Sequence, residues 1–150
     1  MGFFKDLVNG LKAEYDEALS VTRAEREKEE KFWNLIVNLD LSDKRIEYST
    51  ANCDRVIYTA YNTKIYRIYN SSGNCIRIIC PEPRTNSYGY KVSYYKKIGN
   101  SSFYPEYETI CNLEILPDAF GIGDFQTMKS LVAKLERMKH SKHIDDMDDF

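Results

Sequence analysis

The sequence predicts an α+β domain: N-terminal helices, a curved antiparallel sheet of five to six strands, and a C-terminal amphipathic helix packed on the sheet. Three observations lead to this class. Apolar residues recur at helical spacing near both ends, residues 44–116 alternate apolar and polar side chains in short runs, and Asn, Gly and Pro separate those runs. A chain of 150 residues can bury a substantial core. We therefore expect one domain over residues 1–142 and a short tail over 143–150.

Residues 1–39 are predicted to be helical. Thr22 to Glu25 has the form of a capping box, so either a second helix begins there or the first one continues. Residues 23–31 are highly charged and predict a solvated stretch, after which Phe32 and Trp33 are expected to anchor the segment on the core. The apolar stripe of the first 22 residues comprises Phe4, Leu7, Val8, Leu11, Tyr15, Ala18, Leu19 and Thr22.

Residues 44–116 are predicted to form the sheet. Asn70 to Gly73 is a turn signal and predicts a hairpin between 64–69 and 75–80. Pro81 and Pro83 end that strand, and a loop is expected at 98–105. One apolar face per strand is typical of an antiparallel meander with one packed and one solvated side. The expected strands are 45–49, 54–61, 64–69, 75–80, 88–97 and 106–115.

Alternation also assigns the tyrosines of the last two strands to a face. The residues expected on the packed side are Tyr88, Tyr90, Val92 and Tyr94 in one strand and Tyr107, Cys111, Leu113 and Ile115 in the other. Asp124 is a favourable N-cap for a final helix over 124–140, whose apolar stripe runs from Phe125 to Met138. This helix is expected to cover the apolar face of the sheet, either alone or together with the N-terminal helix.

The sequence carries little equipment for catalysis. The motifs GxSxG, GxGxxG, HExxH and the P-loop are all absent. His140 and His143 have a spacing that suits one helix face, but the sequence places no further ligands beside them, and the four cysteines lack CxxC spacing. We therefore expect a non-enzymatic protein with no catalytic residues, no metal and no cofactor.

Charge is divided unevenly along the chain. Residues 44–104 contain 10 Lys and Arg against 3 Asp and Glu, a net charge of +7, although the whole chain has a net charge of −2. A partner responds to such a local potential and not to the average. The sheet region is therefore the part of the chain expected to bind an anionic partner.

Basic and aromatic residues are predicted to share the solvated face of that sheet. Cations can follow phosphates while aromatic rings stack on bases, so this combination indicates single-stranded nucleic acid, either DNA or RNA. The same residue types also occur on ordinary solvated sheet faces. The candidate nucleic-acid-binding residues are Arg55, Tyr61, Arg67, Tyr69, Arg77, Lys91, Tyr95 and Lys97.

The last eight residues form an acidic stretch that is expected to be a disordered, partner-docking tail. Its candidate docking residues are Asp145, Asp146, Asp148, Asp149 and Phe150. The stretch 145–150 resembles the acidic C-terminal tip of bacterial and phage single-stranded DNA-binding proteins, although it lacks the Pro that often precedes the terminal Phe. The resemblance implies a tail that recruits protein partners and competes for the protein's own nucleic-acid groove.

Two alternatives to nucleic-acid binding follow from the same sequence. One is a protein–protein interaction module, such as a phage or mobile-element accessory factor that acts on a host protein through its sheet edge, acidic helix or tail. The other is a peripheral membrane protein that binds through residues 1–19, but the acidic polar face of that helix would be repelled by anionic lipid. No apolar run approaches the roughly 18 residues of a membrane span, and the start lacks signal-peptide features, so the predicted location is cytoplasmic.

Overall fold

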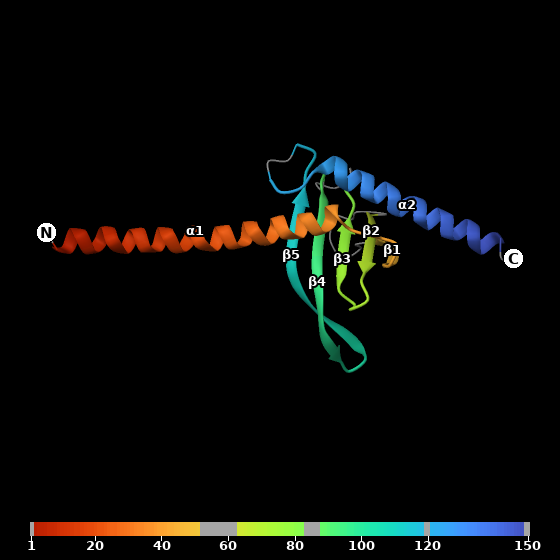
Figure 1. The fold of residues 1–150 in the computed structure, drawn as a ribbon, viewed down its shortest axis with the longest axis horizontal. Coiled ribbons are helices and arrows are strands. Elements are labelled where there is room, and N and C mark those ends of the chain that lie inside the picture. Colours follow the sequence, from red (N-terminus) through yellow and green to blue (C-terminus); the bar gives the residue numbers. More distant parts are fainter. Residues whose placement is uncertain (1, 52–62, 83–87, 119–120, 149–150) are drawn as a thin grey trace.

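The computed structural model confirms the α+β class (Figure 1). The structure describes residues 2–51, 63–82, 88–118 and 121–148. The predicted strand at 54–61, with Arg55 and Tyr61, lies outside these residues. The elements in chain order are α1 (Gly2–Val37), β1 (Arg45–Ala51), β2 (Thr63–Tyr69), β3 (Cys75–Ile79), β4 (Tyr90–Ser101), β5 (Tyr104–Ile115) and α2 (Phe125–Asp148).

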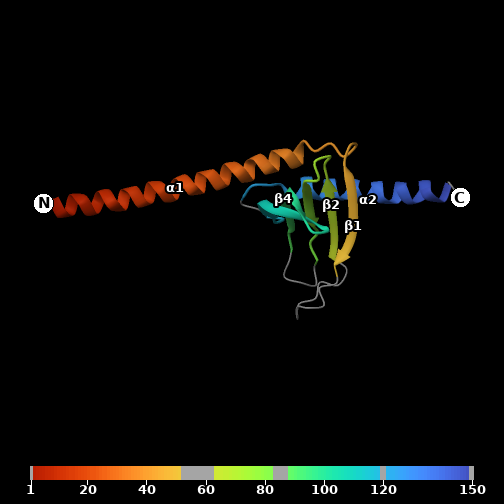
Figure 2. The same cartoon turned by 90° about the horizontal axis from the view of Figure 1, so that it is seen from below.

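The N-terminal segment is one continuous helix. No Pro interrupts residues 2–37, and Gly10 alone does not stop a helix of this length. An exposed Arg26–Glu30 pair at 3.3 Å adds a small i,i+4 contribution in the charged stretch. Only the end of α1 lies over the sheet, where Phe32 and Ile36 are buried, and the rest extends beyond it (Figures 1 and 2).

The five strands form an antiparallel meander in the order β1-β2-β3-β4-β5. The predicted hairpin is confirmed, since β2 and β3 pair antiparallel with Ile68 opposite Ile76. Its turn is closed by the Gly73 amide, which donates to the Asn70 carbonyl at 3.0 Å, and Gly73 has the positive φ of 85° that glycine tolerates best. This turn fixes which residues of the two strands lie opposite each other.

Both helices pack on the same face of the sheet. The Phe32 ring of α1 lies 5.8 Å from the Tyr94 ring, and the Phe125 ring of α2 lies 5.1 Å from the Tyr90 ring. The Tyr66 hydroxyl of β2 donates a hydrogen bond to Glu136 of α2. The fully buried side chains on this side include Ile68, Ile78, Val92, Ile115, Met128 and Leu135. Neither of the two described helices packs on the opposite side of the sheet.

The β4–β5 hairpin differs from the prediction in three places. The expected loop at 98–105 is wrong, because both strands continue and a two-residue turn at Ser102 and Phe103 joins them. Pro105 is tolerated because β5 is an edge strand. The core assignment of Tyr88 is also wrong: Tyr88 precedes β4 and is 61% exposed.

The third difference is a β-bulge in β5. Tyr94 pairs with Cys111 but Tyr95 pairs with Thr109, so Ile110 is an extra residue in β5. The bulge reverses the alternation on the N-terminal side of Ile110. Tyr107, which was expected on the packed side with Cys111, therefore lies on the opposite face, where it pairs with Lys97.

Helix α2 begins as predicted and ends later than predicted. The Asp124 carboxylate accepts hydrogen bonds from the Thr127 amide at 3.1 Å and from the Thr127 hydroxyl at 2.6 Å. No Gly or Pro follows Gly123, so nothing stops the helix at residue 140 and it continues to Asp148. The backbone of tail residues 143–148 is therefore part of α2. Within the ranges that the structure describes, no helix is long and apolar enough to cross a membrane.

Replacing Met128 by Ala tests the packing of α2 on the sheet. Met128 is 0% exposed, so truncation should lower the free energy of unfolding by about 2–5 kcal/mol, because it removes buried methylenes and leaves a cavity. The matched control is Met138→Ala on the same helix, which is 36% exposed and should change that free energy by no more than about 0.5 kcal/mol. Urea denaturation followed by circular dichroism measures both. Equal effects at the two positions would contradict this packing.

The cap of α2 should make stability depend on pH. The hydrogen bonds from Thr127 lower the pKa of Asp124 below its ordinary value of 3.8, so the ionised carboxylate stabilises the folded state. This stabilisation is fully present when the pH is above the pKa of Asp124 in the unfolded chain. It is lost as the pH falls through the lower pKa that Asp124 has in the folded protein. Asp124→Asn keeps a capping oxygen without the charge, so we expect it to remove this acid dependence. The measurement is the thermal midpoint between pH 2 and pH 6, with Asp118→Asn as the exposed control.

Candidate nucleic-acid interface

The side of the sheet opposite the helices is here called the open face. Cross-strand partners lie on the same side of a sheet, so the pairing register gives its rows. Five of the eight predicted binding residues lie on it, and they come from three adjacent strands. The rows are Arg45, Tyr69, Cys75 and Tyr95; Glu47, Arg67, Arg77 and Ser93; and Ser49, Ile65, Ile79 and Lys91.

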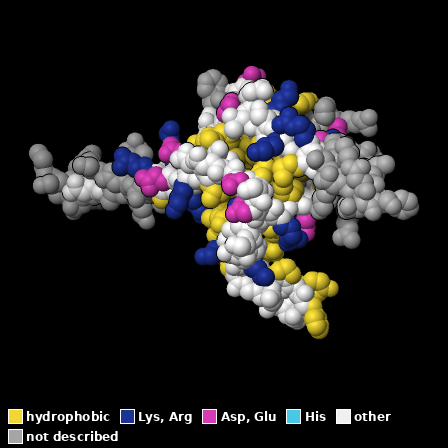
Figure 3. Space-filling model, turned by 45° about the vertical axis from the view of Figure 1, so that its right-hand side comes forward, with side chains coloured by type: hydrophobic (Ala, Val, Ile, Leu, Met, Phe, Trp, Pro, Cys, Tyr) yellow, Lys and Arg dark blue, Asp and Glu magenta, His cyan; other side chains and the backbone are white. Residues whose placement is uncertain are grey.

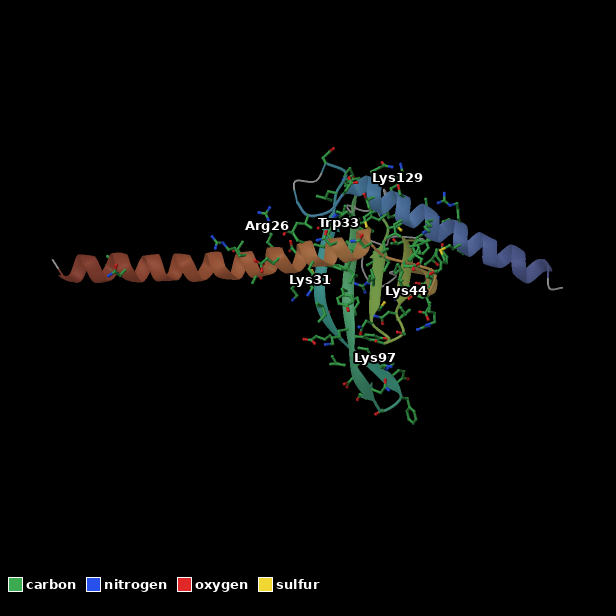
Figure 4. The ribbon with its side chains drawn as sticks, viewed as in Figure 1. Arg26, Lys31, Trp33, Lys44, Lys97 and Lys129 are labelled. Atoms are coloured by element: carbon green, nitrogen blue, oxygen red, sulfur yellow. The ribbon has the colours of Figure 1, made fainter. Side chains whose placement is uncertain are left out.

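The remaining predicted residues lie at the end of this face or outside the described residues. Lys97 is in β4 beyond the bulge, where its backbone N–H donates to the Asn74 side chain at 3.0 Å (Figure 4). Its side chain passes so close to Gly73 that a Cβ there would lie 2.8 Å from the Lys97 Cδ. Arg55 and Tyr61 lie outside the described residues. The open face therefore unites Arg67, Tyr69, Arg77, Lys91 and Tyr95, with Lys97 at its edge.

Two hollows occur on the open face. The first has a volume of about 220 Å³ and is lined by Arg67, Tyr69, Cys75, Arg77, Tyr95 and Tyr107. The second has a volume of about 310 Å³ and is lined by Arg77, Ile79, Lys91, Ser93, Asn112, Leu113 and Glu114. Arg77 lines both hollows, so they are neighbours on this face.

Tyr107 is the site residue that sequence reasoning missed. It reaches the first hollow only because Ile110 is bulged out of the pairing between β4 and β5. The available signal was the consecutive apolar pair Ile110 and Cys111, which breaks strict alternation. A single strand pattern does not show which side of such a break changes face.

The cations of the open face differ in how they are paired. Arg45 forms an ion pair with Glu47 and lies 4.1 Å from the centre of the Tyr69 ring. Arg67 donates a hydrogen bond to the Ser49 hydroxyl at 2.9 Å. Arg77 lies 5.1 Å from the centre of the Tyr95 ring, and its buried Nε has no hydrogen-bond partner in the described part of the chain. Among the described residues, Arg45 is therefore the cation of this face that has a carboxylate partner, whereas Arg67, Arg77 and Lys91 form no ion pair.

The middle of the open face is more buried than a solvated sheet surface. Cys75, Ile65 and Ser93 are buried, whereas Arg45, Glu47 and Lys91 at the margins are exposed. Burial raises the pKa of the Tyr69 hydroxyl, and the Cys75 thiol and the Glu47 carboxylate raise it further. Burial also raises the pKa of the Cys75 thiol. At neutral pH both groups keep their protons, so they can donate hydrogen bonds but are poor bases and nucleophiles.

A larger hollow of about 500 Å³ lies on the other side of the molecule, between the end of α1 and the β2–β3 turn. Several of its polar groups already serve local structure. The Asn38 side chain donates to the Asn34 carbonyl, the Asp40 carboxylate accepts from Ser42, and the Asn70 side chain accepts from the Asn74 amide. This hollow therefore offers less free recognition chemistry than the open face.

Apolar side chains gather at the tip of the β4–β5 hairpin, which projects from the body (Figure 3). Phe103 is 96% exposed and Tyr104 is 76% exposed, and Ile98 is exposed further back in β4. These three residues are here called the hairpin tip. Such a cluster on a protruding element is typical of a contact surface.

Other chemistry that the sequence raised has less support. Among the side chains that the structure describes, no three His, Cys, Asp or Glu residues lie close enough to hold a metal ion. The side chains of His140 and His143 are outside that set.

Comparison of the chain with protein-family models, with curated proteins and with solved structures found no match.

Proposed function

We propose that the protein is a non-enzymatic, single-stranded nucleic-acid-binding protein that holds the strand on its open face. The observation that carries the proposal is the convergence of Arg67, Arg77 and Lys91 with Tyr69 and Tyr95 on one hollowed side of the sheet. Neighbouring strands lie about 4.8 Å apart, so these cations form a compact group. Phosphates would contact them while bases stack on the rings.

The hollowed shape supports an unpaired strand over a duplex. A duplex presents stacked bases inside two backbones, whereas a single strand can turn individual bases outward onto aromatic rings. The rings of Tyr69, Tyr95 and Tyr107 surround a hollow of about 220 Å³, a volume suited to single groups and not to a helix. Tyr107 adds a third ring to the two that the sequence predicted.

The acidic C-terminal residues have a proposed role in partner docking. Helix α2 packs on the side opposite the open face, and its C-terminal end extends beyond the sheet (Figure 1). The placement of the backbone of 145–148 supports docking of the proposed residues Asp145, Asp146, Asp148, Asp149 and Phe150 with a separate protein more than competition for the open face. Of these, Asp149 and Phe150 lie outside the described residues.

Fluorescence anisotropy with a labelled single strand across a salt series tests the proposed function. Binding should weaken steeply as salt rises, because neutralised phosphates release counterions. Lys91→Gln removes one such contact and should reduce the slope of log K against log salt by about 0.7. The matched control is Lys129→Gln, which removes an exposed lysine from α2 in the helical layer (Figure 4). Unchanged anisotropy at low salt would exclude the proposal.

A protein-interaction module is the second candidate, and the hairpin tip favours it. The tip exposes aromatic surface at the start of β5, which is one of the two edge strands of the sheet. An antiparallel edge can pair with an identical edge about a two-fold axis, so the occupant that this geometry suits is a second copy of the chain.

Sedimentation velocity over a concentration series tests the hairpin tip. The wild type should sediment faster as concentration rises, and Phe103→Ser should shift association to at least about tenfold higher concentration, because a buried aromatic anchor contributes 2 kcal/mol or more. Tyr88→Ser, at another exposed tyrosine, is the control and should leave association unchanged. A wild type that stays monomeric at all concentrations would rule out self-association through the tip.

A further inference from the structure

Arg67 and Arg77 form an unusual pair. The register of the β2–β3 hairpin places them directly opposite each other, with Cβ atoms that such pairs hold about 4.5–5.5 Å apart. Like charges in this position repel each other. The ion pairs in the described chain are Arg26–Glu30, Asp43–Lys44 and Arg45–Glu47, and none of them includes Arg67 or Arg77. The nearest carboxylate along the row, Glu47, is already paired with Arg45.

The guanidinium of Arg77 has an unmet hydrogen-bonding need. Its Nε is buried and has no partner among the residues that the structure describes. Buried N–H groups are nearly always paired in folded proteins, and the cost of an unpaired one is higher for a charged group. Positive charge and a buried N–H without a partner among the described residues therefore occur together at Arg77.

The surrounding side chains hold the two guanidinium groups in place. The Ser49 hydroxyl accepts from Arg67 at 2.9 Å, and the Tyr95 ring lies beside Arg77 at 5.1 Å. The buried Cys75 and the rings of Tyr69 and Tyr107 complete the wall of the hollow. No carboxylate is among the six lining residues. The hollow thus offers preset cationic and neutral donors, which suits an anion.

The charge of the pair indicates which anion fits. Two guanidinium groups carry a charge of +2, and each presents a planar fork that matches phosphate oxygens. A phosphate monoester carries about −1.5 to −2 at pH 7 and has three terminal oxygens. A backbone phosphodiester carries a single negative charge, so it would leave one guanidinium uncompensated.

We propose that Arg67 and Arg77 bind a phosphate monoester, the terminal phosphate of a nucleic-acid strand or of a nucleotide. This inference rests on the proposed function in taking the ligand to be a nucleic acid, and it adds that the open face recognises a strand end. The strand would then continue from the first hollow past Arg77 towards Lys91, through the second hollow.

The test compares labelled strands of one sequence that differ only in the phosphate at the unlabelled end. For the wild type, anisotropy should give a dissociation constant about tenfold lower for the phosphorylated strand, because charge-assisted hydrogen bonds are gained only there. Strands with a 5′-phosphate and with a 3′-phosphate are measured separately, to identify the end. Arg77→Lys keeps the charge and removes the fork, so it should abolish most of the preference. Lys91→Gln should weaken both strands equally and keep the preference.

A second measurement separates this inference from the proposed function. Inorganic phosphate and a mononucleoside monophosphate are titrated against the full-length protein, with the thermal midpoint as readout, for the wild type and for Arg67→Lys. If these ligands raise the wild-type midpoint and strands do not bind, the phosphate site stands and nucleic-acid binding fails. If strands bind with no preference for a terminal phosphate, nucleic-acid binding stands and the phosphate site is wrong. The wild-type comparison decides the matter even if a variant fails to fold.

Discussion

The turn between β2 and β3 sets the arrangement on which both faces of the sheet depend. Its hydrogen bond from Gly73 to Asn70 places Arg67 opposite Arg77 and Ile68 opposite Ile76. A slip of one residue would exchange the faces of a strand, so arginines would enter the helical layer and isoleucines would lie on the open face. One short turn thus determines that the apolar side chains meet the helices and that the cations gather on the open face.

The bulge at Ile110 adds a second constraint of the same kind. On the C-terminal side of the bulge, Cys111, Leu113 and Ile115 of β5 complete the core. On its N-terminal side, the alternation is reversed and Tyr107 joins the aromatic wall of the first hollow. A bulge also strengthens the local twist, which is consistent with the curved β4–β5 hairpin leaving the body (Figure 1). A second register shift, between Lys97 and Gly99, lies nearer the tip, so the course of this hairpin depends on both irregularities.

The sequence predicted the features that depend on local signals and missed those that depend on pairing. Asn70 to Gly73 and Asp124 carry their own turn and capping chemistry, so the hairpin and the start of α2 were predictable. The polar stretch from Gly99 to Ser102 suggested a loop, but pairing with β5 makes most of it strand, which shows tertiary context overriding propensity. The alternation of side chains along each strand was enough to predict that Arg67, Arg77 and Lys91 lie on one face. The ring of Tyr107 and the buried Nε of Arg77 required the three-dimensional register.

The open face lowers the stability of the sheet relative to what other residues in the same positions would give. Its central row places two arginines side by side in a half-buried position, where a pair of apolar or oppositely charged residues would stabilise the sheet more. The capped helix α2, the apolar packed face and the β2–β3 turn, by contrast, follow the ordinary rules. A local departure from these rules, in a hollow and beside aromatic rings, is the pattern expected of a binding site and not of a structural element. If an anion compensates both guanidinium groups, as we propose, its binding offsets this cost, and occupation of the site should raise the stability of the sheet.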